Sequence, residues 1–292
     1  MSSSRVVMFA SLAAIWGASF LFMRIAVPFI GPVWTAQLRV SIAAAVLLAY
    51  VAMTKKTYFI RPRTKHFWVL GAFNSAFPFV LFAYAALHLP AGYSAVLNAI
   101  APLFAAVFSI FMLGERLTWR IVVGAIVAMA GISLMVQLGP VTPTKDTLLA
   151  VLACTLATVF YGFAGSWSKK YLQGVPGVVN AVNSQVFAAI SLIPFSMASP
   201  LPHDVPLKAW AAVIALAIVC SALAYLMFFK LLETWTITRV TSVTFLIPAF
   251  GIFWGWLFLS EPITISMVFG FMLVLIATAL TMGIGPFKKK LV

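Results

Sequence analysis

The sequence predicts an all-α polytopic membrane protein whose ten transmembrane helices form two inverted five-helix repeats. Three observations predict it: 64% of the 292 residues are hydrophobic and only 8% are charged, the apolar residues form ten long stretches, and the second half of the chain matches the first at a constant offset. Soluble domains carry about 25% charged residues. A soluble globule is therefore excluded, and so is a disordered chain, which would be poor in apolar residues.

Each apolar stretch is close to the roughly 20 residues that a spanning helix needs. The stretches are continuous, whereas the strands of a transmembrane β-barrel alternate in polarity. Short connections with Pro, Gly or basic residues separate them, so no soluble domain is inserted. The first stretch is long enough to span and is not interpreted as a cleaved signal peptide. The expected spans are residues 6–27, 34–53, 67–88, 92–113, 119–137, 148–168, 178–199, 208–229, 237–259 and 263–283.

The positions of Lys and Arg predict the orientation. With the N-terminus in the cytoplasm, 15 of the 19 Lys and Arg residues fall on the inner side and 4 on the outer side. The positive-inside rule therefore places both termini in the cytoplasm, in a multi-pass protein of the cell inner membrane. Helix ends at the inner surface account for the net charge of +14, and no nucleic-acid partner is expected.

An internal repeat appears when the chain is compared with itself at an offset of 146, which places Pro102 on Pro248 and Glu115 on Glu261. Chance similarity between apolar helices is the alternative. We place the first repeat at residues 1–140 and the second at 146–287. Five spans is an odd number, so the second repeat enters the membrane from the opposite side. Inverted repeats of this kind are typical of transporters that bind a solute near the midplane.

Three strings carry a resemblance to a known family: WGASFLFMRIA, YAALHLPAGYSAVLNAIAPLFAAVFSIFMLGERLTW and TSVTFLIPAFGIFWGWLFLSEPIT. They resemble the EamA repeat of the drug/metabolite transporter superfamily, and the resemblance covers nearly the whole chain. It implies a ten-helix inner-membrane exporter of metabolites or amino acids, and the aromatic content is similar to that of aromatic amino acid exporters. In one departure, residues 260–262 read Ser-Glu-Pro where residues 114–116 read Gly-Glu-Arg, so the two helix ends are not expected to be capped identically.

The first span carries the first candidate site, because Trp16, Phe20 and Arg24 are spaced four apart and share one helical face. An aromatic wall with a cation beside it would suit an aromatic zwitterion, since rings stack and a guanidinium pairs with a carboxylate. The alternative is ordinary packing, with an arginine that snorkels to the outer interface. For Arg39, near the outer end of the second span, we expect the interface.

The other candidates are aromatic, histidine, amide or hydroxyl side chains within the spans, where polar groups are costly and tend to face the interior of the bundle. Each has a simpler alternative, which is helix packing, a proline kink or an interfacial position. The candidates are Phe77, Tyr84 and His88 in the third span, Asn98 in the fourth, Tyr161 and Trp167 in the sixth, Tyr225 in the eighth, and Thr244 and Phe245 in the ninth.

Glu115 and Glu261 are either proton-coupling carboxylates or helix-end residues that pair with a cation or cap a neighbouring helix. We favour the second interpretation because both follow a span instead of lying inside one. No Asp or Glu occurs in the middle of a span, so export driven by the solute gradient is expected in place of a carboxylate proton relay.

Together these features predict an exporter of small organic solutes, above all aromatic amino acids or similar amphipathic metabolites. Alternating access would expose an aromatic-lined cavity between spans 1, 3, 4, 6, 8 and 9, with spans 5 and 10 as packing supports. No enzyme motif is present, so neither a catalytic residue, a cofactor nor a metal site is expected, and the two cysteines are interpreted as buried apolar residues. The expected partners are the small-molecule substrate and the lipid bilayer, for a monomer or a homodimer.

Two alternatives stay open. The first is a polytopic enzyme that processes lipid phosphates, for which Arg24, Arg39 and His88 on the outer side would be the candidate residues. The second is a carrier of sugar phosphates or nucleotide sugars, which would need several Lys or Arg residues in the interior.

Overall fold

The computed structural model describes residues 3–55, 61–138, 142, 144–199, 204–235, 240 and 242–282, and these residues form helices and short connections with no strand. Eight helical stretches are long and apolar enough to cross a membrane, and two shorter apolar helices, Trp119–Met135 and Ile247–Leu259, bring the number to ten. The predicted fold class, a ten-helix membrane protein made of two repeats, is confirmed. Residues 237–239 and 241, at the beginning of the ninth predicted span, lie outside the described part.

The helices follow the predicted spans with shifted ends. Proline lies in the first turn of α2, α6 and α13, where its missing N–H costs no helical hydrogen bond. The first half comprises α1 (Ser3–Ile30), α2 (Pro32–Thr54), η1 (Arg61–Arg63), α3 (Thr64–Gly71), η2 (Ala72–Ala76), α4 (Phe77–Ala85), α5 (Ala91–Asn98), α6 (Ala101–Leu113) and α7 (Trp119–Leu138). The second half comprises α8 (Lys145–Tyr171), α9 (Gly177–Met197), α10 (Leu207–Ala217), η3 (Ile218–Leu223), α11 (Ala224–Leu232), η4 (Ser242–Phe245), α13 (Ile247–Leu259) and α14 (Ile265–Met282).

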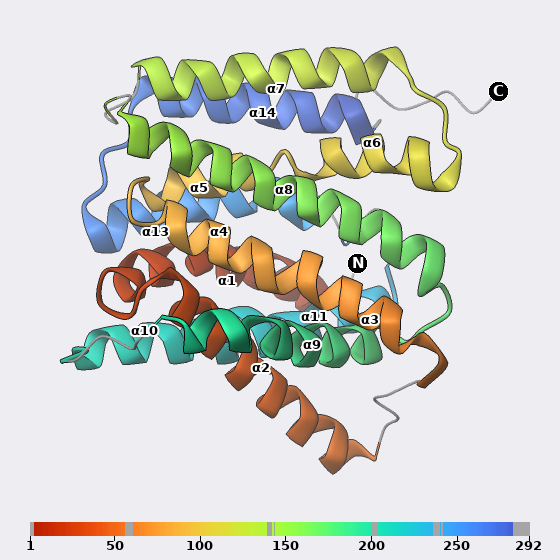
Figure 1. The fold of residues 1–292 in the computed structure, drawn as a ribbon. Helices are drawn as coiled ribbons and strands as arrows, with labels where there is room; N and C mark the ends of the chain where they lie inside the picture. The colour runs from red at the N-terminus through yellow and green to blue at the C-terminus, as the bar shows by residue number, and fades with distance from the viewer. Residues whose placement is uncertain are drawn as a thin grey trace.

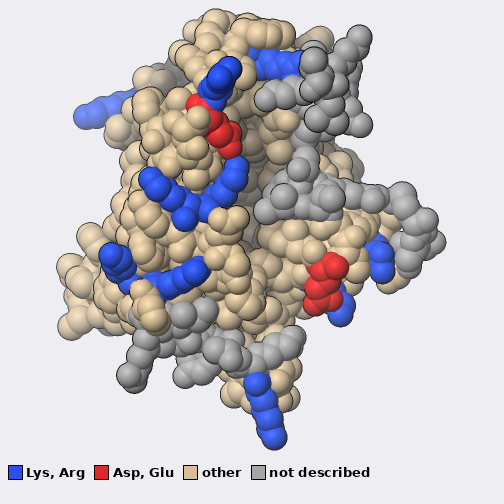
Figure 2. All heavy atoms as spheres, turned by 90° about the vertical axis from the view of Figure 1, so that its right-hand side faces the viewer, with Lys and Arg blue, Asp and Glu red and all other residues tan. Residues whose placement is uncertain are grey.

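The spans lie side by side in one bundle, with the α7–α14 pair along one edge and α2 and α10 along the opposite edge (Figure 1). Successive spans alternate in direction, so the C-terminal ends of α2 and α8 and the N-terminal end of α3 lie together. We call this the basic end, because Lys and Arg gather there and outnumber Asp and Glu (Figure 2). Its described cations are Arg5, Lys55, Arg63, Lys65, Arg116, Arg120, Lys169, Lys170 and Lys230.

The two halves carry the same irregularities at the predicted offset. The third and eighth spans each contain a π-helical turn, η2 and η3, which begin 146 residues apart at Ala72 and Ile218. The fourth and ninth spans are each interrupted just before a proline-bearing helix, α6 or α13. Because short, irregular elements are rarely shared by chance, the repeat that the sequence suggests is also a structural repeat.

The ends of α6 and α13 correct one expectation. Gly114 and Ser260 both adopt the left-handed conformation, with φ of 72° and 54°. The next residue donates the same kind of hydrogen bond in both halves, from Glu115 N to the Ser109 carbonyl (3.3 Å) and from Glu261 N to the Gly255 carbonyl (3.2 Å). The backbone caps are therefore alike despite the different sequences, because a serine tolerates this conformation at a modest energetic cost.

The halves interlock because the first helix of each packs on the fourth span of the other, α1 on α13 and α8 on α6. Gly17 and Gly162 allow these close crossings. A Cβ atom at Gly17 would lie 2.7 Å from the Phe250 Cβ, and one at Gly162 would lie 2.6 Å from the Ala105 backbone nitrogen. Small residues at such crossings let membrane helices approach closely.

The outer surface of the bundle suits a lipid environment. Many large apolar side chains are exposed along the helices, including Phe111, Met129, Leu152 and Phe269. Exposed apolar surface of this extent would be a liability in water but is satisfied by hydrocarbon chains. The chain is therefore a multi-pass membrane protein.

Candidate functional site

A cavity of about 1290 Å³ lies between the two halves. All spans except α7 and α14 contribute to its wall, so the second and seventh spans, α2 and α9, line it in addition to the six expected ones. At one extreme the wall includes Lys169, Gln173 and Glu233, which lie at the basic end. The described lining residues nearest the opposite end are Met23 and Phe82, which are 3% and 2% exposed, whereas Lys169, Gln173 and Glu233 are exposed. We infer that the cavity opens toward the basic end and is closed toward the other.

Six of the twelve predicted site residues line this cavity. They supply aromatic rings from three spans and polar groups from two others, and Trp16 packs against Phe228 with ring centroids 5.6 Å apart. The six are Trp16, Phe20, Asn98, Tyr161, Tyr225 and Thr244.

The other six are not part of the lining. Phe77 lies in a separate, apolar cavity of about 310 Å³, and Tyr84 packs against His88 with ring centroids 5.3 Å apart. Trp167 joins an aromatic cluster near the basic end, with its ring 4.3 Å from that of Tyr171. Arg24 takes part in an ion pair described below, and Phe245 lies next to the lining residue Thr244 at the end of η4.

Arg39 is the main residue that the sequence interpretation misplaced. We expected it at the outer interface, but it is 6% exposed and lines the cavity. Its Nε donates to Ser221 Oγ at 2.9 Å, and its Cζ lies 3.6 Å from the centroid of the Phe79 ring. Helix α2 is covered on this side by α4, α9 and η3, so the side chain has no short route to the membrane surface.

Further polar groups reach the wall from η2 and α9, and these were also missed from the sequence. Asn74 Nδ2 donates to Tyr225 OH at 3.3 Å and to Ser184 Oγ at 3.4 Å. One lining atom, Asn180 Oδ1, is buried and has no hydrogen-bond partner among the described residues. Since buried polar atoms normally have partners, it leaves hydrogen-bonding capacity for a solute or for water.

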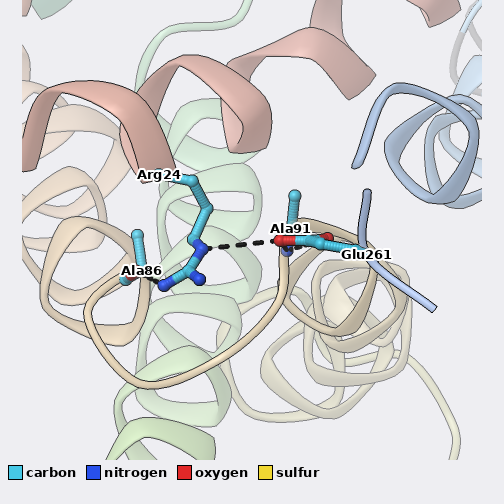
Figure 3. A network of polar contacts seen from close by, with 4 residues as sticks. All are labelled: Arg24, Ala86, Ala91 and Glu261. Atoms are coloured by element: carbon cyan, nitrogen blue, oxygen red, sulfur yellow. Dashed lines mark hydrogen bonds and ion pairs between the residues drawn. The ribbon is translucent and has the colours of Figure 1, made fainter. Parts of the chain in front are cut away.

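An ion pair between the two halves closes the end of the bundle opposite to the basic end. Arg24 of α1 points at the connection between α4 and α5 (Figure 3), where its Nε lies 3.4 Å from Glu261 Oε1 and its Nη1 donates to the Ala86 carbonyl at 2.7 Å. Both Glu261 oxygens also accept from the Ala91 N–H, at 2.9 and 3.1 Å. The carboxylate therefore caps the N-terminus of α5 and meets the positive end of that helix dipole.

The corresponding ion pair at the basic end is open to its surroundings. Lys169 Nζ lies 2.9 Å from Glu115 Oε1, and the two side chains are 64% and 51% exposed, against 31% for Arg24 and 12% for Glu261. The interpretation of both glutamates as helix-end residues that pair with cations or cap a helix is confirmed.

Comparison with known proteins agrees with this architecture. The model of the EamA-like transporter family matches twice, over residues 4–137 and 148–283. A transporter of Archaeoglobus fulgidus is 25% identical over 92% of this chain and 95% of its own. A probable terminal-alkyne amino-acid exporter of Streptantibioticus cattleyicolor is 25% identical over 87% of this chain and 86% of its own.

A solved crystal structure shares the fold, with a TM-score of 0.64 and 19% identity over 96% of both chains. Two matches of one family model, each over about half of the chain, agree with the two halves that the π-helical turns and helix ends define independently. The chain is a membrane transporter of small solutes and belongs to the EamA-like transporter family.

Proposed function

We propose that the protein exports amphipathic organic solutes, with amino acids that carry an aromatic or other apolar side chain as the main class. The observation that carries this proposal is the cavity between the halves, which combines aromatic walls with polar groups and opens at one end only. Its volume of about 1290 Å³ leaves ample space for one such solute and water. The amino-acid exporter named among the relatives supports the class, as does the aromatic content, which is similar to that of the aromatic amino acid exporter YddG.

We further propose that the repeats extend over residues 1–140 and 146–287, that the basic end faces the cytoplasm of a bacterial-type inner membrane, and that both termini lie on that side. Under the positive-inside rule, the basic end is the cytoplasmic one. The cavity then faces the compartment from which an exporter loads its solute.

Alternating access follows from the interlocked halves. A solute enters from the basic end and reaches the level of Trp16 and Tyr161. The Arg24–Glu261 pair then opens while the halves close around Lys169 and Glu115, and the solute leaves on the other side. Because the halves are related by inversion, both states use similar contacts and differ by a small free energy.

The arrangement supports a carrier over the lipid-phosphate enzyme. Such an enzyme would need its cationic and histidine groups together at one surface. Instead, Arg24 is paired with Glu261, Arg39 lies in the cavity wall and His88 packs against Tyr84. The wall also lacks the several interior cations that a sugar-phosphate carrier would use, because Arg39 and Lys169 are its only Lys or Arg residues among those described.

The direct test is flux of labelled L-phenylalanine and other amino acids in proteoliposomes, with and without a pH gradient. We expect saturable flux that persists without the gradient. Trp16→Ala should reduce it at least tenfold, because its ring lines the cavity and packs against Phe228.

Phe77→Ala is the matched control, since this aromatic residue lies outside the central cavity and its loss should change flux less than twofold. Wild-type vesicles that transport none of the amino acids, or a Phe77 variant as impaired as the Trp16 variant, would contradict the proposal.

A further inference from the structure

Arg39, which lines the cavity, has an equivalent position in the other half that carries an uncharged residue. Arg39 in α2 and Gln185 in α9 are 146 residues apart, the same offset that relates the two π-helical turns. Ser75 in η2 and Ser221 in η3 are related by that offset too. These four residues therefore form two copies of one arrangement, each built across the interface between the halves.

The hydrogen bonds confirm the equivalence. Arg39 Nε donates to Ser221 Oγ at 2.9 Å, and Gln185 Nε2 donates to Ser75 Oγ at 2.9 Å. In each copy, a side chain on the second span of one half donates to a serine in the π-helical turn of the other half. Because an uncharged amide makes the equivalent hydrogen bond in the other half, this hydrogen bond alone does not require an arginine at position 39.

The arginine places a positive charge in the membrane interior with no anion beside it. None of the five acidic residues, all of which lie in the described part of the chain, forms an ion pair with Arg39. Its contacts are a serine hydroxyl and the face of the Phe79 ring, and neither carries a negative charge. A guanidinium stays protonated under all physiological conditions, and a buried charge without a partner is strongly unfavourable.

Resting on the proposed export function, we propose that Arg39 binds the carboxylate of the solute and thereby selects monocarboxylates with an apolar body. The planar guanidinium matches a carboxylate in a two-point hydrogen bond. Phe79 holds the guanidinium from one face, and the rings of Trp16, Phe82 and Tyr161 line the same cavity for the apolar body. The equivalent residue Gln185 is uncharged and does not line the cavity, so Arg39 provides the single interior anion site among the described lining residues.

Ligand-induced thermal stabilisation of the purified protein tests this proposal without depending on flux. The probes share an aromatic ring and differ in charge: L-phenylalanine, 3-phenylpropionate, L-phenylalaninamide and phenyl phosphate, with inorganic phosphate added as a small anion. We expect the two carboxylates to stabilise the wild type at concentrations at least tenfold lower than the amide. A ligand that binds only the folded protein raises its apparent stability.

Three variants separate charge from structure. Arg39→Gln makes the two equivalent positions identical and should weaken carboxylate binding at least tenfold, since Gln185 shows that the amide fits this arrangement. Arg39→Lys keeps the charge and should lose less. The double variant Arg39→Gln/Gln185→Arg moves the charge to the equivalent position, which does not line the cavity, and should bind carboxylates no better than Arg39→Gln.

Equal stabilisation by the amide and the carboxylates, or stronger stabilisation by either phosphate, would overturn the assignment. The same holds if Arg39→Gln binds carboxylates as tightly as the wild type. Should Arg39→Gln fail to fold, the probe series on the wild type decides alone. Carboxylate binding without flux in vesicles would contradict the export function but support the carboxylate site at Arg39. Flux without a preference for carboxylates would support the export function but contradict the carboxylate site.

Discussion

At the scale of single residues, Glu261 joins three structural elements through one carboxylate. It pairs with Arg24 of α1, caps α5 through Ala91, and follows α13. Hydrogen bonds to charged groups contribute about 1.5–3 kcal/mol each, and the low exposure of this carboxylate keeps solvent from screening it. Gly255 provides the space, because a Cβ atom there would lie 2.3 Å from Glu261 Oε2.

Glu261→Gln is expected to open the end of the bundle opposite to the basic end. The variant keeps the size of the side chain but removes the charge that holds Arg24 and strengthens the cap of α5. A loss of about 1.4 kcal/mol shifts an equilibrium tenfold, so a cysteine at Met23, a lining residue near this end, should react about tenfold faster with an impermeant maleimide added outside the cell. The measurement uses a Cys154→Ala/Cys220→Ala background, which removes both native thiols.

Glu115→Gln is the control for this prediction. Its ion pair with Lys169 is more than half exposed, and exposed pairs contribute about 0–1 kcal/mol. Labelling at position 23 from outside should therefore stay within twofold of the parent. Equal effects of the two substitutions, or no change with Glu261→Gln, would show that the Arg24–Glu261 pair does not hold this end closed.

The site residues that were missed show where sequence reasoning reaches its limit. Arg39 follows the start of α2 by only seven positions, which by helical rise alone places it about 10 Å along the helix and within reach of the interface. Its burial depends on which neighbours cover that face of α2, and this is a property of tertiary packing. The self-comparison did hold a signal, because the offset of 146 aligns Arg39 with a polar residue, Gln185, inside another span.

At the scale of elements, the crossings at Gly17 and Gly162 fix how the halves meet. In both crossings, atoms of the neighbouring helix backbone lie where a side chain would begin, with Gly251 N 2.9 Å from a Cβ at Gly17 and Ala105 N 2.6 Å from one at Gly162. Backbone atoms cannot move aside as a flexible side chain can, so even one methyl group forces the helices apart.

Gly162→Ala is expected to destabilise the protein by about 1–3 kcal/mol, the usual cost of overpacking, although alanine is the better helix former. Thermal unfolding in detergent, monitored by size-exclusion chromatography, would measure this loss of stability. Gly165→Ala, one turn later in α8, is the matched control because a Cβ there has no atom within 4 Å, and it should be neutral or slightly stabilising. An unfolding temperature unchanged by Gly162→Ala would show that the α6–α8 contact is looser than the structure indicates.

The π-helical turns are elements that periodicity cannot predict. Residues 72–76 and 218–223 read as ordinary apolar helix, with no proline or glycine inside either turn. A π-helical turn is a local rearrangement often found at functional sites. Here each turn brings two residues to the cavity wall or next to it, Asn74 and Ser75 in η2 and Cys220 and Ser221 in η3, and both serines accept a hydrogen bond from the other half.

At the scale of the whole molecule, the direction of each span was predictable, because membrane thickness fixes the length of a helix and basic residues mark one side. Comparison of the chain with itself suggested the repeat, and three sequence strings pointed to the family. Which spans surround the cavity was predictable only in part: α7 and α14 are outside its wall as expected, whereas α2 and α9 also line it. That difference again reflects packing between halves and not the pattern within one helix.

If the two halves are inverted, the connection after α2 and the connection between α7 and α8 lie on opposite sides of the membrane. A cysteine at Lys55, exposed after α2 at the basic end, should react with an impermeant maleimide only after the cells are permeabilised. A cysteine at Thr142, exposed between α7 and α8, should react in intact cells. Reaction of both from the same side would mean that an even number of spans separates them, and the inversion of the second half would be wrong.

The two ion pairs at the ends of the bundle give the empty carrier a preferred resting direction. A perfectly symmetric pair of halves would face both compartments equally often when empty. At one end of this chain, Arg24 pairs with the largely buried carboxylate of Glu261. At the other end, Lys169 pairs with Glu115, and both side chains are more than half exposed. The cap on Ala91 and shelter from water both strengthen the first contact relative to the second. Under the proposed alternating access, we therefore expect the unloaded protein to rest open toward the compartment at its basic end and to return to that side after the solute leaves.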